Sequence, residues 1–372
     1  MRYYIIAGER SGDLHGSNLI AELRKRDPGA KIRCWGGEMM KNAGGELAMD
    51  YRNTAYMGIW ETLVNFPAIF RNLRFCKKDI LAFKPDALIL IDYPGFNLRI
   101  ARFAKRKGLK TIYYISPKIW AWNTGRVKTI KANVDLMLAV LPFEPQFYKK
   151  YGMDVEYVGN PVYDAVKAHK ADTDFFEKNN LPDDKEIVAL LPGSRAQEVK
   201  KVLPAMVETA MLFPTYHFVI AGVRNLDPGI YDVASRVENI SIVYEQAYDL
   251  LAYSDAAIVT SGTATLETAL WDVPQVAVYK TSAVTYLLAK MVVKVKFITL
   301  VNLIGGKEIV KELIQDDANA GEIGRELTGL MHDKERRSLM IQEYNRIKEK
   351  LGEEKASVRA ARRIIAFVSG KR

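Results

Sequence analysis

The stretch SDAAIVTSGTATLETAL, residues 254–270, contains the local pattern that decides the fold. An apolar run at 256–259 stops at the tripeptide TSG (260–262), and a helical pattern then begins that carries Glu267 about one turn in. A buried strand that leads through a glycine turn into a helix is the building unit of α/β proteins. The turn is either an ordinary tight connection or a helix N-terminus that binds an anion.

The same strand-then-helix unit recurs along the chain. Short apolar runs that predict strands lie at 3–8, 86–92, 110–116 and 135–140, and again at 186–195, 216–222, 240–245, 255–262 and 274–280. Continuous apolar strands alternating with helices indicate parallel sheets covered on both faces. The polar segment 165–184 predicts a linker, so we expect two consecutive α/β domains, at 1–165 and 185–349. Helical patterns alone follow from about residue 305 and end in a basic helix at 356–368.

The charge balance narrows the classes of partner. The 372 residues include 54 Lys and Arg against 44 Asp and Glu, for a formal charge of +10. Nucleic acid, an anionic membrane surface or phosphorylated small molecules would each suit this charge, and so would a basic surface without a partner. The chain has neither a block of like charges nor a nucleic-acid reader motif, so we expect no nucleic-acid partner.

The sequence gives little support for a membrane-spanning, secreted or metal-binding protein. The best candidate for a membrane span, residues 283–304, is interrupted by three lysines. Cys34 and Cys76 are far apart in sequence and form no metal-ligand or redox spacing, so we expect no metal site and no disulfide framework. The N-terminal apolar run is too short for a signal peptide, which favours a cytoplasmic location.

The loop after the first predicted strand, GERSGDLHG, is rich in glycine and ionisable groups. It contains Glu9, Ser11, Gly12, Asp13 and His15. Its spacing departs from G-x-G-x-x-G, so the fingerprint of a dinucleotide-binding loop is missing. Because ligands of open α/β sheets bind at the carboxyl ends of strands, we predict a functional loop. The alternative is a tight turn with Asp13 near the helix cap.

A second candidate position is Asp92, which ends the apolar strand at 86–92 and precedes YPGFN with Asn97. At the end of a buried strand, the pKa of a carboxylate can be tuned for proton abstraction. The alternative is an Asp that opens a Pro-Gly turn.

The motif ISPKIWAWNTGR (115–126) follows a further strand. It brings Ser116, Trp120 and Trp122 close to the basic residues Lys118 and Arg126. Two close tryptophans are typical of a core, but beside two cations they would also suit a wall for a sugar or an acyl chain.

The second half of the chain has two strand ends suited to phosphate. LLPGSRAQE ends a strand with Gly193, Ser194 and Arg195 and starts a helix, and SGTATLE does the same with residues 261–263. Arginine makes bidentate contacts to phosphate, and a helix N-terminus adds free N–H groups and a favourable dipole. Neither loop matches the P-loop G-x-x-x-x-G-K-[ST], so we predict a diphosphate pocket rather than nucleoside triphosphate hydrolysis.

The segment YMGIWETLVNFPAIFRNLRF (56–75) is amphipathic, with large apolar residues interleaved with arginines. A helix that packs inward on the core is the ordinary interpretation. The alternative is a segment that enters the membrane interface, with its basic residues on anionic lipid. The residues that we expect to contact the membrane are Trp60, Leu63, Phe66 and Phe70.

Taken together, AGERSGDLHG, IDYPGFN, SPKIWAW with Arg126, LPGSRAQE, SGTATLE and VNLIGGKE resemble the lipid-A-disaccharide synthase family. The six matches occur in order from residue 7 to about 314. The resemblance implies a GT-B fold, in which two Rossmann-like domains face each other across a cleft and a C-terminal helix, about 350–372, returns to the first domain. It also implies a homodimer that needs no metal or other cofactor and acts as a peripheral protein on the cytoplasmic face of the inner membrane.

The family's reaction joins two lipid-linked sugars. The resemblance implies UDP-2,3-diacylglucosamine as donor, 2,3-diacylglucosamine 1-phosphate (lipid X) as acceptor, and the β(1→6)-linked disaccharide 1-phosphate plus UDP as products. We expect Asp92 to be the general base, with Glu9, Asp13 and His15 as the other candidates. The residues expected to bind substrate are Ser11, Gly12, Asn97, Ser116, Trp120, Arg126, Gly193, Ser194, Arg195, Ser261, Gly262, Thr263, Thr265, Glu267, Asn302 and Lys307. Among these, Glu267 is expected to accept hydrogen bonds from the ribose hydroxyls.

Two positions depart from the family pattern, and two other classes of protein remain open. Asn160 stands where the family commonly has His, and Lys307 where Arg is usual, which puts a bidentate contact at Lys307 in doubt. Another GT-B enzyme, such as a UDP-sugar 2-epimerase or a glycosyltransferase with a soluble acceptor, is the nearest rival. A nucleotide-sugar-binding module without turnover is another. The apolar segment 56–75 argues against a soluble acceptor, and the carboxylates around Asp92 argue against a mere binder of anions.

Overall fold

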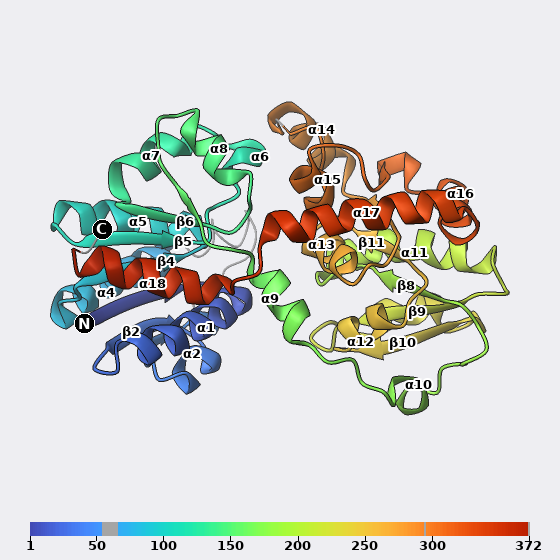
Figure 1. Cartoon of the computed structure of the whole chain (residues 1–372), viewed down its shortest axis with the longest axis horizontal. Coiled ribbons are helices and arrows are strands. Elements are labelled where there is room, and N and C mark those ends of the chain that lie inside the picture. Colours follow the sequence, from blue (N-terminus) through green and yellow to red (C-terminus); the bar gives the residue numbers. More distant parts are fainter. Residues whose placement is uncertain (54–65, 294, 371–372) are drawn as a thin grey trace. The chain divides into compact units, whose positions relative to one another are not determined.

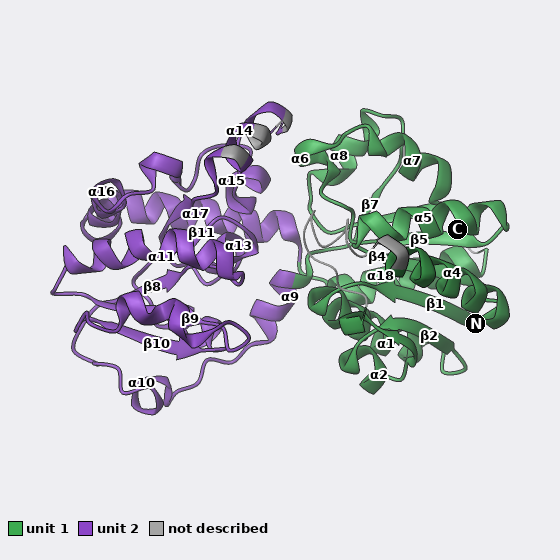
Figure 2. Cartoon of the chain, turned by 180° about the vertical axis from the view of Figure 1, so that it is seen from behind, with its two compact units in different colours: residues 1–161, 353–372 green, residues 162–352 purple. Residues whose placement is uncertain are grey.

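The structure is a computed structural model of the chain that describes residues 1–53, 66–293 and 295–370. Its contacts divide the chain into two compact units (Figure 2). Unit 1 comprises Met1–Pro161 and Glu353–Arg372, and unit 2 comprises Val162–Gly352. Each unit is built on a sheet whose strands all run parallel, and helices connect successive strands along the chain (Figure 1).

The sheet of unit 1 has the strand order β3-β2-β1-β4-β5-β6-β7. Its strands are β1 (Arg2–Ala7), β2 (Lys31–Gly36), β3 (Glu46–Asp50), β4 (Ala87–Ile91), β5 (Lys110–Tyr114), β6 (Leu136–Ala139) and β7 (Glu156–Tyr157). Its helices are α1 (Arg10–Arg26), α2 (Glu38–Asn42), α4 (Phe66–Phe83), α5 (Pro94–Arg106), α6 (Ile119–Trp122), α7 (Arg126–Asn133), α8 (Glu144–Lys149) and α18 (Ala356–Val368), with a short 3₁₀ turn at Tyr51–Asn53.

Both faces of this sheet are buried. Successive side chains of a strand point to opposite faces. Tyr3 and Ile5 of β1 belong to one apolar core, whereas Tyr4 and Ile6 belong to another. Because both sets are buried, β1 is apolar throughout rather than alternating, as expected for a parallel sheet covered on both sides.

The C-terminal helix returns to unit 1. Ala360, Ala361 and Ile364 of α18 are buried in the same core as Leu19 of α1. The small side chains of Ala360 and Ala361 suit the close packing of α18 on α1. An ion pair joins Arg363 to Glu156 of β7. The prediction that a helix at about 350–372 returns to the first domain is confirmed.

The sheet of unit 2 has the order β10-β9-β8-β11-β12-β13. Its strands are β8 (Ile187–Leu191), β9 (His217–Gly222), β10 (Ile240–Tyr244), β11 (Ala256–Thr260), β12 (Gln275–Tyr279) and β13 (Glu312–Ile314). Its helices are α9 (Pro161–Ala168), α10 (Phe175–Lys178), α11 (Ala196–Met211), α12 (Ala247–Ala252), α13 (Thr263–Leu270), α14 (Ala283–Val292), α15 (Leu300–Gly305), α16 (Ala320–His332) and α17 (Lys334–Leu351), with 3₁₀ turns at Pro228–Ala234 and Gln315–Asp317.

The segment 165–184, predicted to be a linker, is instead an integral part of unit 2. Phe175 is fully buried and stacks on Tyr253, with ring centroids 5.8 Å apart. His169 Nε2 lies 2.8 Å from a carboxylate oxygen of Asp249. A few apolar side chains in a polar stretch are thus enough to fix it on the core. The boundaries therefore fall at 161/162 and 352/353, rather than around the predicted linker and at 349/350.

Helix α4 buries one side and exposes the other. Leu73, Cys76 and Ile80 lie in the core, whereas Phe70 is 64 % exposed and Phe75 is 40 % exposed. Trp60, Leu63 and the side chain of Phe66 lie outside the described residues, so the expected membrane segment is visible only in part. Among the described helices, none is long and apolar enough to cross a bilayer.

Candidate active site

Each sheet has a topological switch point, where the strand order turns from one direction to the other. In unit 1 it lies between β1 and β4, and in unit 2 between β8 and β11. Open α/β sheets bind ligands at the carboxyl ends of such strands. The loops that begin at Gly8, Asp92, Pro192 and Ser261 follow these four strands and carry most of the predicted site residues.

The chain makes a strained turn where β4 ends. Asp92 has φ 42° and Tyr93 has φ 49°, two consecutive non-glycine residues in the left-handed region. The Asp92 carbonyl accepts hydrogen bonds from Tyr113 Oη at 2.5 Å and from Asn97 Nδ2 at 2.8 Å. A Cβ atom on Gly8 would lie 2.3 Å from the Tyr93 ring, so a glycine is needed there. Such strain persists when its surroundings enforce it, and it is concentrated at functional sites.

The electrostatic surroundings of Asp92 suit a base. The pKa of Asp92 is raised to about 6, mainly by burial and also by the negative charge of Glu9, while Lys118 opposes both effects. Glu9 itself accepts a hydrogen bond from Ser11 Oγ at 2.6 Å. A carboxylate with a pKa just below neutral pH is deprotonated yet basic enough to take a proton. The structure therefore brings Asp92, Glu9 and Ser11 into one electrostatic neighbourhood.

His15 lies on the first turns of α1, close enough to Glu9 to sense its charge. Burial lowers the pKa of His15 to about 4, and Glu9 partly offsets this effect. Its Nδ1 is buried without a hydrogen-bond partner among the described residues. His15 is thus a neutral imidazole at neutral pH, and a strongly shifted group beside Glu9 marks a site rather than a plain turn.

Asp13 is a structural residue, which corrects its prediction as a candidate base. Its side chain is 2 % exposed. The carboxylate accepts N–H groups from Gly37 at 2.7 Å, Met40 at 3.0 Å and Met39 at 3.2 Å. These are the unpaired donors at the start of α2, so Asp13 ties α1 to α2 and is not available to substrate. Its neighbour Gly12 is buried and allows α1 to approach Ala7 of β1 closely.

Asn97 and Ser116 were predicted to bind substrate but are buried and bonded within the protein. Asn97 is fully buried and donates to the carbonyls of Ile91 and Asp92, so it holds the backbone of the base rather than a ligand. The Ser116 hydroxyl lies 2.7 Å from Tyr148 Oη.

The two tryptophans of α6 have different environments. Trp120, predicted to line the site, is 7 % exposed, and its Nε1 donates to Glu144 at 3.2 Å, so it belongs to the core. Trp122 is 46 % exposed, and the Arg126 guanidinium lies 5.0 Å from its ring centroid. Trp122 with Arg126 is therefore the surface able to meet a sugar or an acyl chain. Sequence alone could not separate two tryptophans two residues apart.

The loop after β8 has the features of a phosphate site. Gly193 has φ 108°, a conformation that favours glycine, and Ser194 is exposed. Arg195 precedes the sixteen-residue helix α11, and its guanidinium lies 2.8 Å from a carboxylate oxygen of Glu198. Because this side chain is largely exposed, a phosphate can compete for it at low cost. Glu198 was not predicted; it holds Arg195 at the helix start.

The loop after β11 leads into α13 through Gly262. Space is open around Gly262, because a Cβ atom there would meet nothing within 4 Å. Ser261 Oγ donates to the carbonyl of Ile298 at 3.0 Å, and Thr263 is exposed on the first turn. The first N–H groups of a helix have no intrahelical partner and attract anions. Thr265 is fully buried and donates to the Gly262 carbonyl at 2.9 Å, so it shapes the turn instead of touching substrate.

Glu267 lies one turn further along α13. Tyr248 Oη donates to one of its carboxylate oxygens at 2.8 Å, and burial raises its pKa. The side chain is partly exposed and remains able to accept further hydrogen bonds. The sequence did not reveal Tyr248, because it lies 19 residues away on α12.

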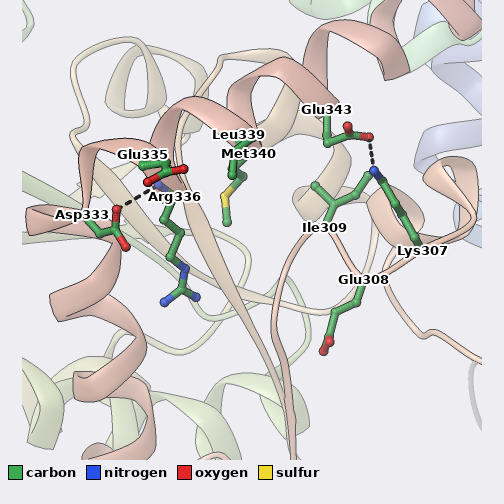
Figure 3. A pocket seen from close by; sticks show the side chains of 9 residues that line it. All are labelled: Lys307, Glu308, Ile309, Asp333, Glu335, Arg336, Leu339, Met340 and Glu343. Carbon is green, nitrogen blue, oxygen red and sulfur yellow. Dashed lines mark hydrogen bonds and ion pairs between the residues drawn. The ribbon is translucent and has the colours of Figure 1, made fainter.

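Asn302 and Lys307 were predicted to bind substrate, but both make contacts within unit 2. Asn302 is fully buried: its Nδ2 donates to Val310 and Glu312, and its Oδ1 accepts from the N–H groups of Ile309 and Val310. Every bonding position of the amide is thus occupied. Lys307 precedes β13, at the amino end of that strand, and pairs with Glu343 of α17 at 3.0 Å beside a surface pocket (Figure 3).

The comparison with known proteins agrees with this arrangement. A sequence profile described as Lipid-A-disaccharide synthetase matches residues 3–366. The chain belongs to this family. It is 40 % identical to the lipid-A-disaccharide synthase of Syntrophus aciditrophicus, over 96 % of this chain and 95 % of that one. With the synthase of Myxococcus xanthus it shares 39 % identity over 99 % and 97 % of the two chains.

Solved structures show how widely the fold of this synthetase family is shared. A UDP-GlcNAc 2-epimerase from Neisseria meningitidis, bound to UDP-GlcNAc, superposes with a TM-score of 0.65 at 16 % identity and covers both chains fully. CalG4, the calicheamicin glycosyltransferase, gives 0.63 at 17 % identity over 99 % of this chain and 98 % of that one. At such low identity the likeness concerns the fold alone, and it confirms the two Rossmann-like domains of GT-B enzymes.

Proposed function

We propose that the chain is an inverting glycosyltransferase that condenses UDP-2,3-diacylglucosamine with 2,3-diacylglucosamine 1-phosphate. The products are the β(1→6)-linked disaccharide 1-phosphate and UDP. Family membership over residues 3–366 supports the reaction. The observation that carries the mechanism is Asp92, a carboxylate with a raised pKa on an enforced, strained strand end.

Asp92 acts as the general base. Its carboxylate takes the proton of the acceptor 6-hydroxyl while that oxygen attacks the anomeric carbon of the donor. The bond from this carbon to the diphosphate breaks, UDP leaves with the bonding electrons, and attack from the opposite side inverts the anomeric centre. Tyr113 and Asn97 hold the Asp92 backbone, so little reorganisation is needed when the substrate arrives.

The leaving UDP is stabilised by the carboxyl edge of the sheet in unit 2. Arg195 and Ser194 supply a positive charge and a hydroxyl, and the N–H groups at Gly262 and Thr263 supply further donors. Donors aimed at a developing negative charge are usually the largest source of catalysis. Glu267 accepts hydrogen bonds from the ribose, and Tyr248 holds its carboxylate in place.

Because the proposed substrates carry acyl chains that reside in a bilayer, the protein must contact a membrane to reach them. Phe70 and Phe75 are exposed on α4, with Arg71 and Arg74 exposed beside them, as in segments that enter a lipid interface. We therefore propose peripheral association with the cytoplasmic face of the inner membrane. Replacing Trp60, Phe66 and Phe70 by Ser should strongly weaken flotation with liposomes and leave the melting temperature nearly unchanged. A large drop in melting temperature would show that the segment is core.

We also propose that the activity needs no metal ion and that the chain forms a homodimer. No group of three His, Cys, Asp or Glu side chains within residues 1–53, 66–293 and 295–370 is arranged to hold a metal ion. Full activity in EDTA would support metal independence, and restoration by Mg²⁺ after a loss would refute it. Light scattering of the purified chain tests the dimer.

One assay decides the function. Purified protein is incubated with both lipid substrates, and disaccharide and UDP are measured with and without EDTA. Equal amounts of the two products are expected, formed roughly 10²–10⁴ times more slowly by Asp92→Asn. Conversion of the UDP-sugar to an isomer without acceptor would favour a 2-epimerase, and transfer only to a soluble sugar would favour another glycosyltransferase.

A further inference from the structure

Helix α14 belongs to an excursion of the chain between β12 and α15, residues 280–298. The excursion starts at the carboxyl end of β12, where the Thr281 N–H donates to Gln315 Oε1 at 2.7 Å. It ends where Ser261 Oγ donates to the Ile298 carbonyl at 3.0 Å. Both ends are therefore fixed at the carboxyl edge of the sheet, beside the loop proposed to hold the diphosphate. Within unit 2, α14 lies at the periphery, beyond α15 (Figure 1).

Several large apolar side chains of this excursion are exposed. Met291 is 78 % exposed, the highest value of any large apolar side chain in the described part of the chain. Leu287 is 63 % exposed and Val293 is 38 % exposed. A contiguous apolar patch on an exposed helix marks an interaction site, whereas single exposed apolar residues are normal.

The same region carries only positive charge. From Val273 to Lys307 the sequence has no Asp or Glu, but it has lysines at 280, 290, 294, 296 and 307. Lys290 and Lys296 are exposed, and Lys296 Nζ lies 5.2 Å from the centroid of the Phe297 ring. An acid-free patch that mixes large apolar side chains with lysines is typical of segments that lie in the interface of an anionic bilayer.

We propose that α14, Val293 and Lys296 form a second membrane contact, on unit 2, that inserts Leu287, Met291 and Val293 into the interface of an anionic phospholipid bilayer. At about 1.5 Å per residue the ten-residue helix is about 15 Å long, so it lies in the interface and does not span it. Lys290 and Lys296 contact the lipid phosphates.

The alternative is that a second copy of the chain covers this patch as a dimer partner. The positive charge of the patch argues against such a dimer. A twofold dimer brings the same patch of both subunits together. Here it would place lysines against lysines with no acid in the segment to neutralise them. An anionic lipid surface has the opposite charge and offers an apolar layer for the helix.

Binding of α14 to lipid has a consequence for catalysis that rests on the proposed function. If the donor carries acyl chains, a lipid-bound α14 holds the loop at Ser261 and Gly262 beside the bilayer that contains those chains. Binding of α14 to lipid does not itself require the reaction, so the two proposals fail separately.

The test is flotation of the full chain with vesicles of phosphatidylglycerol and phosphatidylcholine, or of phosphatidylcholine alone, without substrate. Leu287→Ser with Met291→Ser should lower the partition coefficient roughly tenfold or more on the anionic vesicles. Lys290→Glu with Lys296→Glu should remove the preference for phosphatidylglycerol. The matched control is Met211→Ser with Leu212→Ser, a pair exposed by 63 % and 58 % at the end of α11, which leads to the amino edge of the same sheet. The control should partition as the unaltered chain does.

Unchanged partition in the α14 variants, or equal loss in the control, would overturn the proposal. So would a dimer that becomes a monomer on Leu287→Ser with Met291→Ser while lipid binding persists, because the patch would then be a protein interface. Glycosyl transfer to detergent-dispersed substrates should be retained in these variants. If no form of the protein transfers sugar but flotation behaves as described, the proposed reaction fails and the membrane contact stands.

Discussion

The carboxyl edges of the two sheets share a topology but differ in chemistry. Both lie at a switch point between the first strand of the unit and a strand that leads in the other direction. The edge of unit 1 presents Asp92 on a strained turn and Glu9 on the loop after β1, and burial together with the charge of Glu9 raises the pKa of Asp92. The edge of unit 2 presents Gly193 and Gly262, which lead directly into helices, and an exposed Arg195.

The difference shows that the fold fixes where a ligand binds, whereas the loops fix what happens to it. A surplus of carboxylates suits the removal of a proton and would repel a diphosphate. Helix N-termini with arginine suit a diphosphate and would hold no base. Each edge is therefore suited to one half of a glycosyl transfer.

The largest expected effect is at the base. Asp92→Asn keeps the size of the side chain but cannot take a proton, so kcat should fall by roughly 10²–10⁴. UDP affinity, measured by calorimetry, should remain unchanged, because the carboxylate is assigned no role in holding UDP. Near-normal kcat in this variant would assign the base elsewhere, with Glu9 next in line.

Asn302 should matter for stability and not for the donor site. Asn302→Ala leaves buried N–H groups at Ile309 and Val310 unpaired, so the free energy of unfolding should fall by about 2–4 kcal/mol. Lys307→Ala is the matched control: it removes an exposed lysine from an ion pair at the surface and should cost at most about 1 kcal/mol. Denaturant titration measures both. Selective loss of UDP affinity in the folded Asn302 variant would restore it to the site.

Arg195 should affect UDP directly. Arg195→Ala removes a charged hydrogen-bond donor from the diphosphate, so the Kd for UDP should rise about 10- to 100-fold. Arg195→Lys keeps the charge but not the planar fork, and an intermediate Kd is expected. Calorimetry with unchanged affinity in both variants would remove Arg195 from the site.

The smallest expected effects are shifts in pH dependence. Because the base acts deprotonated and the pKa of Asp92 is about 6, kcat/KM should fall as the pH drops through this value. Glu9→Gln removes a charge that raises this pKa, so the acid limb should move to lower pH. Lys118→Gln should move it to higher pH. Shifts in the same direction in both variants would contradict the assignment.

The sequence predicted the fold well because apolar runs and glycine turns report buried strands and their ends directly. The parallel sheets, the positions of Asp92 and Arg195 and, through the family resemblance, the returning α18 were all accessible in this way. The prediction of a linker at 165–184 was wrong because Phe175 and Leu181 pack into the core of unit 2. Two apolar residues hardly change the composition of an otherwise polar segment, so the pattern did not reveal them.

Four of the errors at the site have a common cause. Asp13, Asn97, Thr265 and Asn302 are polar residues within or near motifs, and sequence does not reveal that their hydrogen bonds end on backbone groups. Asp13, for instance, meets N–H groups 24 to 27 residues away. Partners at such separations appear only once the chain is folded.

The division between the two edges is tested most directly by a crystal structure of the full chain with UDP. The diphosphate is expected within hydrogen-bond distance of Arg195 and of the N–H groups at Gly262 and Thr263, with the ribose on Glu267. UDP bound instead by the Gly8–Gly16 loop of unit 1 would contradict the account.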